Sequence, residues 1–267
     1  MKANYHTHTT WCDGKDPPRA VVEAAIAKGF DALGFSSHAM LPGRYLEWAL
    51  TPEKAPRYAA EIRALAAEYA PRLKILCGVE ADWLKDEAEP SYAVYSSISP
   101  DYIIGSVHFV RAADGGIVCV DKSPQSLEVG VRDHLGGDVR AFVSAYFAAV
   151  RESLAFDFDI VGHPDLVRKF NSGNRYFDES ANWYLDELER TADAIAASGK
   201  IVEVNTGAIS RGWLDDAYPS PSFRVMLRER GVGFVISADA HSAETIDCAF
   251  DRFGGCERFR QAFWKSA

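Results

Sequence analysis

Six of the seven histidines in this chain stand at or just after short apolar runs, and two acidic residues occupy equivalent places. These eight residues are His6, His8, His38, Glu80, His108, His163, Asp239 and His241. Imidazole nitrogens and carboxylate oxygens are common metal ligands in proteins. With Asp13 as a ninth candidate, the donors suffice for two or three divalent ions that keep positions open for water.

The spacing of His6 and His8 suits a shared ion. On a strand, residues i and i+2 point to the same face, so both imidazoles can reach one metal. A single buried histidine is more often a hydrogen-bonded core residue, but independent structural roles would scatter six of them over helices and loops. His134, in a polar segment, is excluded for that reason.

The acidic candidates have structural alternatives as well. Glu80 in ILCGVEAD could belong to a buried ion pair, yet it needs a cation in either case. Asp239 could cap a helix at residues 242–249. Cys12 is a soft donor near His8, but a small packing residue is the better interpretation.

The elements that carry these residues alternate between strand and helix patterns. Strands are expected at residues 3–8, 32–37, 73–79, 102–107, 159–161, 201–205 and 233–237. Helices are expected at residues 17–28, 52–69, 85–97, 138–154, 179–198 and 222–229, and a final helix at the C-terminus. This alternation predicts an α/β fold with a parallel sheet, and seven units favour a distorted (β/α)7 TIM-like barrel. We expect a single domain over residues 1–267, with the candidate ligands on the rim formed by the carboxyl ends of the strands.

One long segment, residues 111–137, interrupts the alternation. It is rich in Gly, Asp, Pro and Ser and is expected to be irregular, with a short helix in its middle. Loops of this length are often lids or contact substrate.

Composition excludes several classes of function. A net charge of −9 argues against non-specific binding to nucleic acid or to an anionic membrane. The five cysteines form no CxxC pair, which favours reduced thiols in a cytoplasm. No apolar stretch approaches the ~20 residues of a membrane span, and the N-terminus has no signal-peptide pattern. A soluble cytoplasmic protein is expected, and nothing in the sequence indicates an oligomeric state.

Seven segments together resemble the polymerase and histidinol phosphatase (PHP) family, and within it the monofunctional histidinol-phosphate phosphatases. They are HTHT, GFSSH, GVEAD, DYIIGSVH, IVGHPDLVRKF, VEVNTGAISR and SADAH, in the order of the family from His6 to His241. The resemblance implies a distorted (β/α)7 barrel with a trinuclear metal site.

The resemblance also implies a distribution of ligands. The first metal would be held by His6, His8, Glu80 and Asp239. The second would be held by His38, His241 and a residue of the loop after HTHT. The third would be held by Glu80, His108 and His163. Many relatives have a histidine in that loop, whereas this chain reads TTWCDGKD. Asp13 is the expected replacement, with Asp16 as the alternative. The mixed donors suit zinc, iron or manganese.

The implied activity is hydrolysis of L-histidinol phosphate to L-histidinol and phosphate, by attack of a metal-bridging hydroxide. Glu80 would bridge metals, and Asp239 or His241 would pass a proton to the leaving oxygen. Cations for the small phosphorylated substrate are expected from Arg211 first, then Arg168 and Lys169, and less so Arg44. Candidate contacts to the histidinol group are Asp82, Phe109 and Asp121.

Other functions remain to be separated from this one. A family phosphatase for another small monoester, such as a sugar or nucleotide phosphate, would share the metal site. A non-catalytic metal-binding module would share it too, because fold does not determine function. A nuclease is disfavoured because the chain shows neither a basic groove nor a further domain. The sequence also has no GxSxG motif and no P-loop motif, which disfavours a serine nucleophile and the hydrolysis of nucleoside triphosphates.

Overall fold

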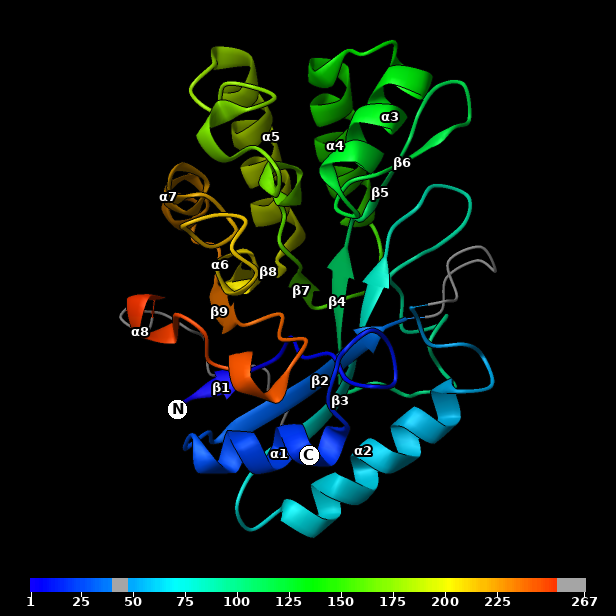
Figure 1. The fold of residues 1–267 in the computed structure, drawn as a ribbon, viewed down its shortest axis with the longest axis vertical. Helices are drawn as coiled ribbons and strands as arrows, with labels where there is room; N and C mark the ends of the chain where they lie inside the picture. Colours follow the sequence, from blue (N-terminus) through cyan, green and yellow to red (C-terminus); the bar gives the residue numbers. More distant parts are fainter. Residues whose placement is uncertain (40–47, 254–267) are drawn as a thin grey trace.

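The computed structural model describes residues 1–39 and 48–253. Its central feature is a sheet of seven strands in the order β1-β2-β3-β4-β7-β8-β9 (Figure 1). The strands are β1 (Ala3–Asn4), β2 (Ala32–His38), β3 (Lys74–Asp82), β4 (Tyr102–Ser106), β7 (Ile160–Val161), β8 (Ile201–Asn205) and β9 (Phe234–Ser237). All neighbouring pairs are parallel.

The sheet nearly closes on itself between its first and last strands. Beyond β1, Thr7 forms an isolated parallel bridge with Ala240, which follows β9. The backbone N–H of His8 donates to Ala240 O at 2.8 Å, and Ala240 N–H donates to His6 O at 3.2 Å. The predicted distorted (β/α)7 barrel is therefore confirmed. The strand expected at residues 3–8 is shorter than predicted, because only this bridge continues it past Asn4.

Helices surround the barrel and pack apolar faces against it. They are α1 (Pro18–Ala27), α2 (Ala55–Tyr69), α3 (Pro124–Leu135), α4 (Val139–Ser153), α5 (Asn182–Ser198), α6 (Gly207–Ser210), α7 (Pro221–Glu229) and α8 (Phe250–Phe253). Figure 1 shows α1 and α2 at one end of the molecule and α3, α4 and α5 at the other. Buried residues such as Phe35 on β2 and Tyr58 on α2 belong to one apolar cluster. The expected C-terminal helix falls mostly outside the described residues, as does the C-terminal end of the predicted 1–267 domain.

The helix predicted at residues 85–97 is wrong. The chain there makes turns, and Leu84 pairs with Ala88 in an isolated antiparallel bridge. Asp86 has a φ of 65°, in the left-handed region that helices do not use. Pro90 supplies no N–H and disfavours helical backbone in the residue before it, so a helix cannot continue through this point.

The segment at residues 111–137 is more ordered than expected. β5 (Phe109–Arg111) and β6 (Ile117–Cys119) form an antiparallel hairpin. The short helix expected in the middle of this segment is present as α3 and has 12 residues. It begins where Ser123 Oγ accepts the backbone N–H of Ser126 at 3.1 Å, a standard N-cap.

Two glycines make room for a tyrosine inside the barrel. The Tyr102 hydroxyl donates to Phe35 O at 3.1 Å. A Cβ at Gly78 would lie 2.4 Å from ring atoms of Tyr102, and a Cβ at Gly34 would lie 2.3 Å from its oxygen. Both contacts are too short for real atoms, so these strand positions require glycine.

We expect Gly78→Ala to lower the free energy of unfolding by about 1–3 kcal/mol, the usual cost of overpacking a core. Urea denaturation measures this directly. In a Tyr102→Leu background the same substitution should cost less, because the ring that it meets is gone. An equal cost in both backgrounds would contradict the assigned contact.

Candidate metal centre

The carboxylate of Glu80, at the carboxyl end of β3, lies in the middle of five imidazoles. Its Oε2 lies 3.1 Å from His6 Nε2, 3.1 Å from His38 Nδ1 and 3.5 Å from His8 Nε2. Its Oε1 lies 3.0 Å from His163 Nε2 and 3.5 Å from His108 Nε2. Ser106 Oγ also donates to Oε1 at 2.7 Å. Four segments distant in sequence therefore converge on one acidic side chain, as predicted from their places at the strand ends.

Burial and mutual proximity shift the pKa values of these groups strongly. Burial raises the pKa of Glu80, but the neighbouring His6, His108 and His38 outweigh it and hold that pKa well below its usual range. Burial lowers the pKa of His8, and the neighbouring His241 and His38 lower it further, to about 3. His8 is therefore unprotonated near neutral pH, so its nitrogens are available as ligands. For His6 and His108 the neighbouring carboxylates outweigh burial and raise the pKa.

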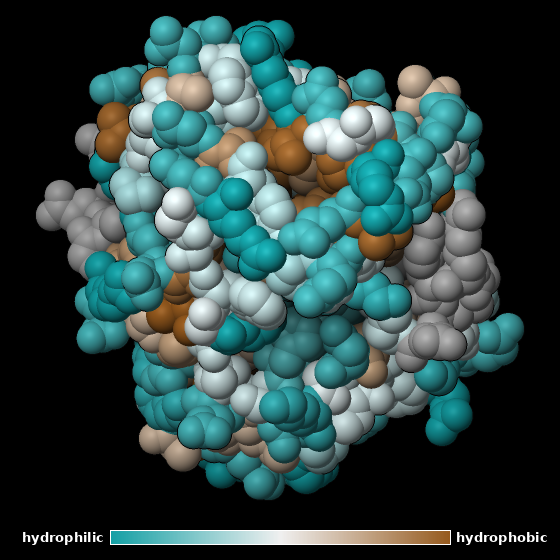
Figure 2. Space-filling view, turned by 45° about the horizontal axis from the view of Figure 1, so that its top comes forward, coloured by the Kyte–Doolittle hydropathy of each residue, from teal (hydrophilic) through white to brown (hydrophobic). Residues whose placement is uncertain are grey.

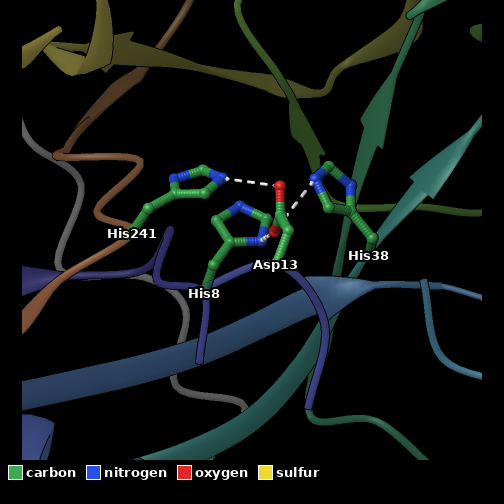
Figure 3. A group of neighbouring side chains, drawn as sticks. All are labelled: His8, Asp13, His38 and His241. Carbon is green, nitrogen blue, oxygen red and sulfur yellow. Dashed lines mark hydrogen bonds and ion pairs between the residues drawn. The ribbon is translucent and has the colours of Figure 1, made fainter. Parts of the chain in front are cut away.

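A second group of candidate ligands lies at the outer side of the cluster and is drawn in Figure 3. Asp13 Oδ2 lies 3.2 Å from His241 Nε2, while Asp13 Oδ1 lies 3.7 Å from both His8 Nδ1 and His38 Nε2. The ligand atoms of these four residues all lie within 4.8 Å of one another. Asp16, the alternative in this loop, instead accepts the backbone N–H of Ala243 at 2.8 Å.

Three further groups share the same spacing of ligand atoms within 4.8 Å. They are His6, His8 and Glu80; His6, His163 and Asp239; and Glu80, His108 and His163. All nine predicted ligands thus take part in at least one group. A fifth group combines His38 and His108 with Asp82.

Unpaired nitrogens show that these groups fit metal ions. Among the described residues, His6 Nε2, His8 Nε2 and His38 Nδ1 are buried and make no hydrogen bond. A buried polar atom without a partner is costly, and such atoms are rare in native proteins. Each of the three nitrogens faces Glu80, so an ion bound between nitrogen and carboxylate would satisfy both.

Two residues behind the ligands were not predicted in this role. Asp82, expected to contact substrate, lies with Oδ1 2.8 Å from His108 Nδ1 and accepts the backbone N–H of His108 at 3.1 Å. Glu203, in the VEVNT segment, was missed entirely and lies with Oε2 2.9 Å from His6 Nδ1. An acidic residue inside an apolar strand was the available signal for Glu203.

Arg211, on the loop after α6, borders the ligands. Its Nη2 lies 2.7 Å from Asp239 Oδ2, and its Nη1 lies 3.1 Å from His241 Nδ1. Burial raises the pKa of Asp239, but Arg211 and His6 outweigh it and hold this pKa well below the usual value. The predicted cation is therefore in contact with the ligand cluster.

A cavity of about 760 Å³ opens above the ligands. Besides ligands it is lined by Lys15, Trp48, Phe109, Cys119, Asp121, Lys122, Ser126, Leu166, Lys169 and Arg211. Lys169 donates to Asp121 Oδ2 at 3.0 Å. The rings of Trp48 and Phe109 stack with centroids 6.2 Å apart. The cavity therefore combines the ligand groups with cations, a carboxylate and an aromatic wall.

One of the predicted cations, Arg168, lies away from the cavity. Arg168 is not among the residues that line this cavity. Its Nε donates to Glu179 Oε2 at 2.6 Å, and its Nη1 lies 3.5 Å from Asp165 Oδ2. The buried guanidinium is thus directed toward two carboxylates that compensate its charge. Arg44 lies outside the described residues.

A smaller, largely apolar cavity of about 180 Å³ lies beside α3 and α4. It is lined mainly by Leu127, Val131, Val139, Phe142, Val167 and Phe177. Figure 2 shows hydrophobic side chains gathered in a hollow of a surface that is otherwise mostly hydrophilic. This cavity contains no group of metal ligands, so it does not compete with the polar cavity as the site for a phosphorylated molecule.

Among residues 1–39 and 48–253, no helix has the length and apolar character needed to cross a membrane.

Comparison with known proteins identifies the family. The sequence profile of the PHP domain matches residues 4–207. The chain belongs to the PHP family. A probable histidinol-phosphatase of Deinococcus radiodurans is 32% identical over 250 residues, covering 92% of this chain and 88% of the relative. The histidinol-phosphatase of Bacillus subtilis is 26% identical over 270 residues, covering 95% and 98%.

Solved structures share the fold of this chain. A Listeria monocytogenes protein, provisionally assigned as the histidinol phosphatase hisK, superposes with a TM-score of 0.84 at 21% identity, covering 94% of this chain and 100% of that chain. The histidinol phosphate phosphatase of Lactococcus lactis, solved with zinc, L-histidinol and phosphate, has a TM-score of 0.57 at 21% identity and covers 91% and 87%. The predicted family resemblance is confirmed.

The choice between Asp13 and Asp16 can be tested in this PHP domain. Removing a residue that hydrogen-bonds to a metal ligand lowers metal affinity by ~10–100-fold. Removing the ligand itself should lower the affinity at least as much. We therefore expect Asp13→Asn to lower the affinity of one zinc position by this amount, measured by competition with a chelator. Asp16→Asn, which removes a contact to backbone, should keep wild-type zinc affinity. The reverse ranking would assign the ligand to Asp16.

Proposed function

We propose that this protein is a metal-dependent phosphomonoesterase that hydrolyses L-histidinol phosphate to L-histidinol and phosphate. The observation that carries the proposal is Glu80, a carboxylate that is 1% exposed and lies within 3.5 Å of five imidazoles. The named relatives and the zinc-, histidinol- and phosphate-bound Lactococcus structure support it. A place in histidine biosynthesis follows from this substrate.

The residues present fit two or three divalent ions. His6, His8, Glu80 and Asp239 would hold the first, His38, His241 and Asp13 the second, and Glu80, His108 and His163 the third. Zinc is the ion of the Lactococcus structure, and the same donors suit iron and manganese. Such ions, when bound, neutralise phosphoryl charge and acidify a bound water.

The protein's own residues hold the substrate and move the proton. A phosphate monoester carries about −1.5 to −2 charges near neutral pH. Arg211 and Lys169, which line the cavity, are the side chains that we assign to this charge. Asp239 and His241 stand together at the wall, with Oδ1 and Nδ1 3.6 Å apart. We assign the proton for the leaving oxygen to His241, because Arg211 and His6 hold the pKa of Asp239 well below its usual value.

The remaining walls suit the histidinol group. It carries an ammonium and an imidazole, which an acid and aromatic rings can bind. Asp121 and Phe109 line the cavity as expected, and Trp48 extends the aromatic wall. Asp82 is not part of this assignment because it bonds to His108.

The proposal includes a cytoplasmic location. The four cysteines among the described residues are free thiols. Free thiols are usual where glutathione and thioredoxin keep cysteines reduced.

Phosphate release from a panel of monoesters tests the proposal. Zinc-loaded protein should show its highest kcat/KM on L-histidinol phosphate, compared with a sugar phosphate and a nucleoside monophosphate. A higher kcat/KM on the sugar phosphate or the nucleoside monophosphate would overturn the assigned substrate, while hydrolysis of a phosphate monoester would remain the reaction. Full metal loading with no release from any of them would instead support a metal-binding module.

A further inference from the structure

Glu203 on β8 is a wholly buried carboxylate whose two oxygens serve different elements. Its Oε2 lies 2.9 Å from His6 Nδ1. Its Oε1 accepts the backbone N–H of His163 and the side-chain amide of Asn205, both at 2.8 Å. No Lys or Arg of the described residues forms an ion pair with it. A buried carboxylate with these neighbours acts on the residues around the metal centre rather than on a surface cation.

The network continues from Asn205 toward Asp239. Asn205 Nδ2 lies 3.3 Å from Asp239 Oδ2. Asn205 Oδ1 accepts the backbone N–H of Gly207 at 2.8 Å, which fixes the orientation of the amide. Glu203 thereby connects to residues that follow β1, β7 and β9.

We infer that Glu203 is a positioning residue that holds His6, His163 and Asp239 in the geometry needed to bind metal. The inference rests on the proposed metal site. A carboxylate can only accept, so His6 must donate through Nδ1–H. That tautomer leaves the lone pair on Nε2, the nitrogen that lies 3.1 Å from Glu80 Oε2 and has no hydrogen bond. Residues that hydrogen-bond to a metal-binding histidine commonly fix its tautomer and the orientation of its ring in this way.

Asp82 provides a comparison within the same site. It contacts the ring and the backbone N–H of one ligand, His108. Glu203 contacts the ring of one ligand, the backbone of a second and, through Asn205, the carboxylate of a third. A change at Glu203 should therefore affect more bound ions than a change at Asp82.

The direct test is the zinc affinity of Glu203→Gln, measured by competition between the metal-free protein and a chromophoric chelator. We expect a loss of ~10–100-fold, the usual effect of removing such a partner. Asp82→Asn should weaken one ion, and Glu203→Gln at least two. Zinc affinity equal to wild type, or a loss confined to one ion, would overturn the inference.

Glu187→Gln is the matched control, because Glu187 is also buried but pairs with Arg151 at 2.9 Å on the outer helices. It should lower thermal stability and leave zinc affinity unchanged. An equal loss of zinc affinity in both variants would show a general effect of removing a buried carboxylate, and would also overturn the inference.

A measurement on the wild type applies if Glu203→Gln does not fold. In zinc-loaded protein labelled with ¹⁵N at histidine, His6 should carry its proton on Nδ1, and a proton on Nε2 would contradict the inference. Wild-type protein that binds no zinc would overturn the proposed metal site itself. Wild-type zinc binding that Glu203→Gln retains would overturn only the role of Glu203.

Discussion

Glu80→Gln should lower kcat/KM for L-histidinol phosphate by about 10³-fold or more. A bound metal supplies several kcal/mol of charge stabilisation, and each ~1.4 kcal/mol is a factor of ten in rate. Gln keeps the size of the side chain but removes the negative charge that lies between five imidazoles. Because Glu80 belongs to two of the ligand groups, its loss should weaken more than one ion.

Steady-state kinetics and elemental analysis of the same preparation measure this effect. Glu187→Gln again provides the control for a buried glutamate away from the site, and it should retain wild-type kcat/KM. Circular dichroism shows whether each variant is folded. A folded Glu80→Gln protein with its full metal complement and more than a tenth of wild-type activity would be incompatible with a bridging role for Glu80.

Arg211→Met should lower kcat/KM by ~10²-fold, the lower end of the effect seen when one preorganised donor to a charged transition state is lost. The guanidinium lines the cavity and contacts Asp239 and His241, so it lies where a phosphate held by the ligand groups would be. Arg211→Lys should recover only part of the activity, because an ammonium lacks the planar fork that matches phosphate oxygens.

Arg168→Met separates this role from a structural one. Arg168 is compensated by Asp165 and Glu179, away from the cavity lining. Removing one partner of a buried ion pair typically costs about 3–5 kcal/mol, so this variant should unfold at lower denaturant concentration with kcat/KM unchanged. A fall in kcat/KM for Arg168→Met together with none for Arg211→Met would exchange the two assignments.

Most of the candidate ligands were predictable because their signal is local. Except for Asp13, each stands at or just after an apolar run that is typical of a buried strand, and parallel strands bring their carboxyl ends to one rim. His6, Glu80 and His163 therefore could be placed together before any coordinates. The same reasoning gave the barrel, since its strands alternate with amphipathic helices.

The residues behind the ligands were not predictable from the same signal. Glu203 and Asp82 lie within strands, where an acid can equally face a ligand, a substrate or a cation. Arg168 and Lys169 are neighbours in the sequence, yet Lys169 lines the cavity and Arg168 bonds to Glu179. The direction of such side chains depends on tertiary packing.

The errors in secondary structure have local causes. Residues 85–97 contain good helix formers, but Pro90 and the left-handed backbone of Asp86 prevent a helix. Residues 111–137 are rich in turn formers, yet the hairpin of β5 and β6 pairs across them and Ser123 caps α3. Pairing between strands and capping of a helix both outweighed composition here.

The most direct measurement is phosphate release from L-histidinol phosphate by one preparation that is stripped of metal and then titrated with zinc. The metal-free protein should release no phosphate above the uncatalysed rate. Activity should return as bound zinc rises to the two or three ions per chain that we propose. Full activity with less than one metal ion per chain would contradict a mechanism built on the Glu80 cluster.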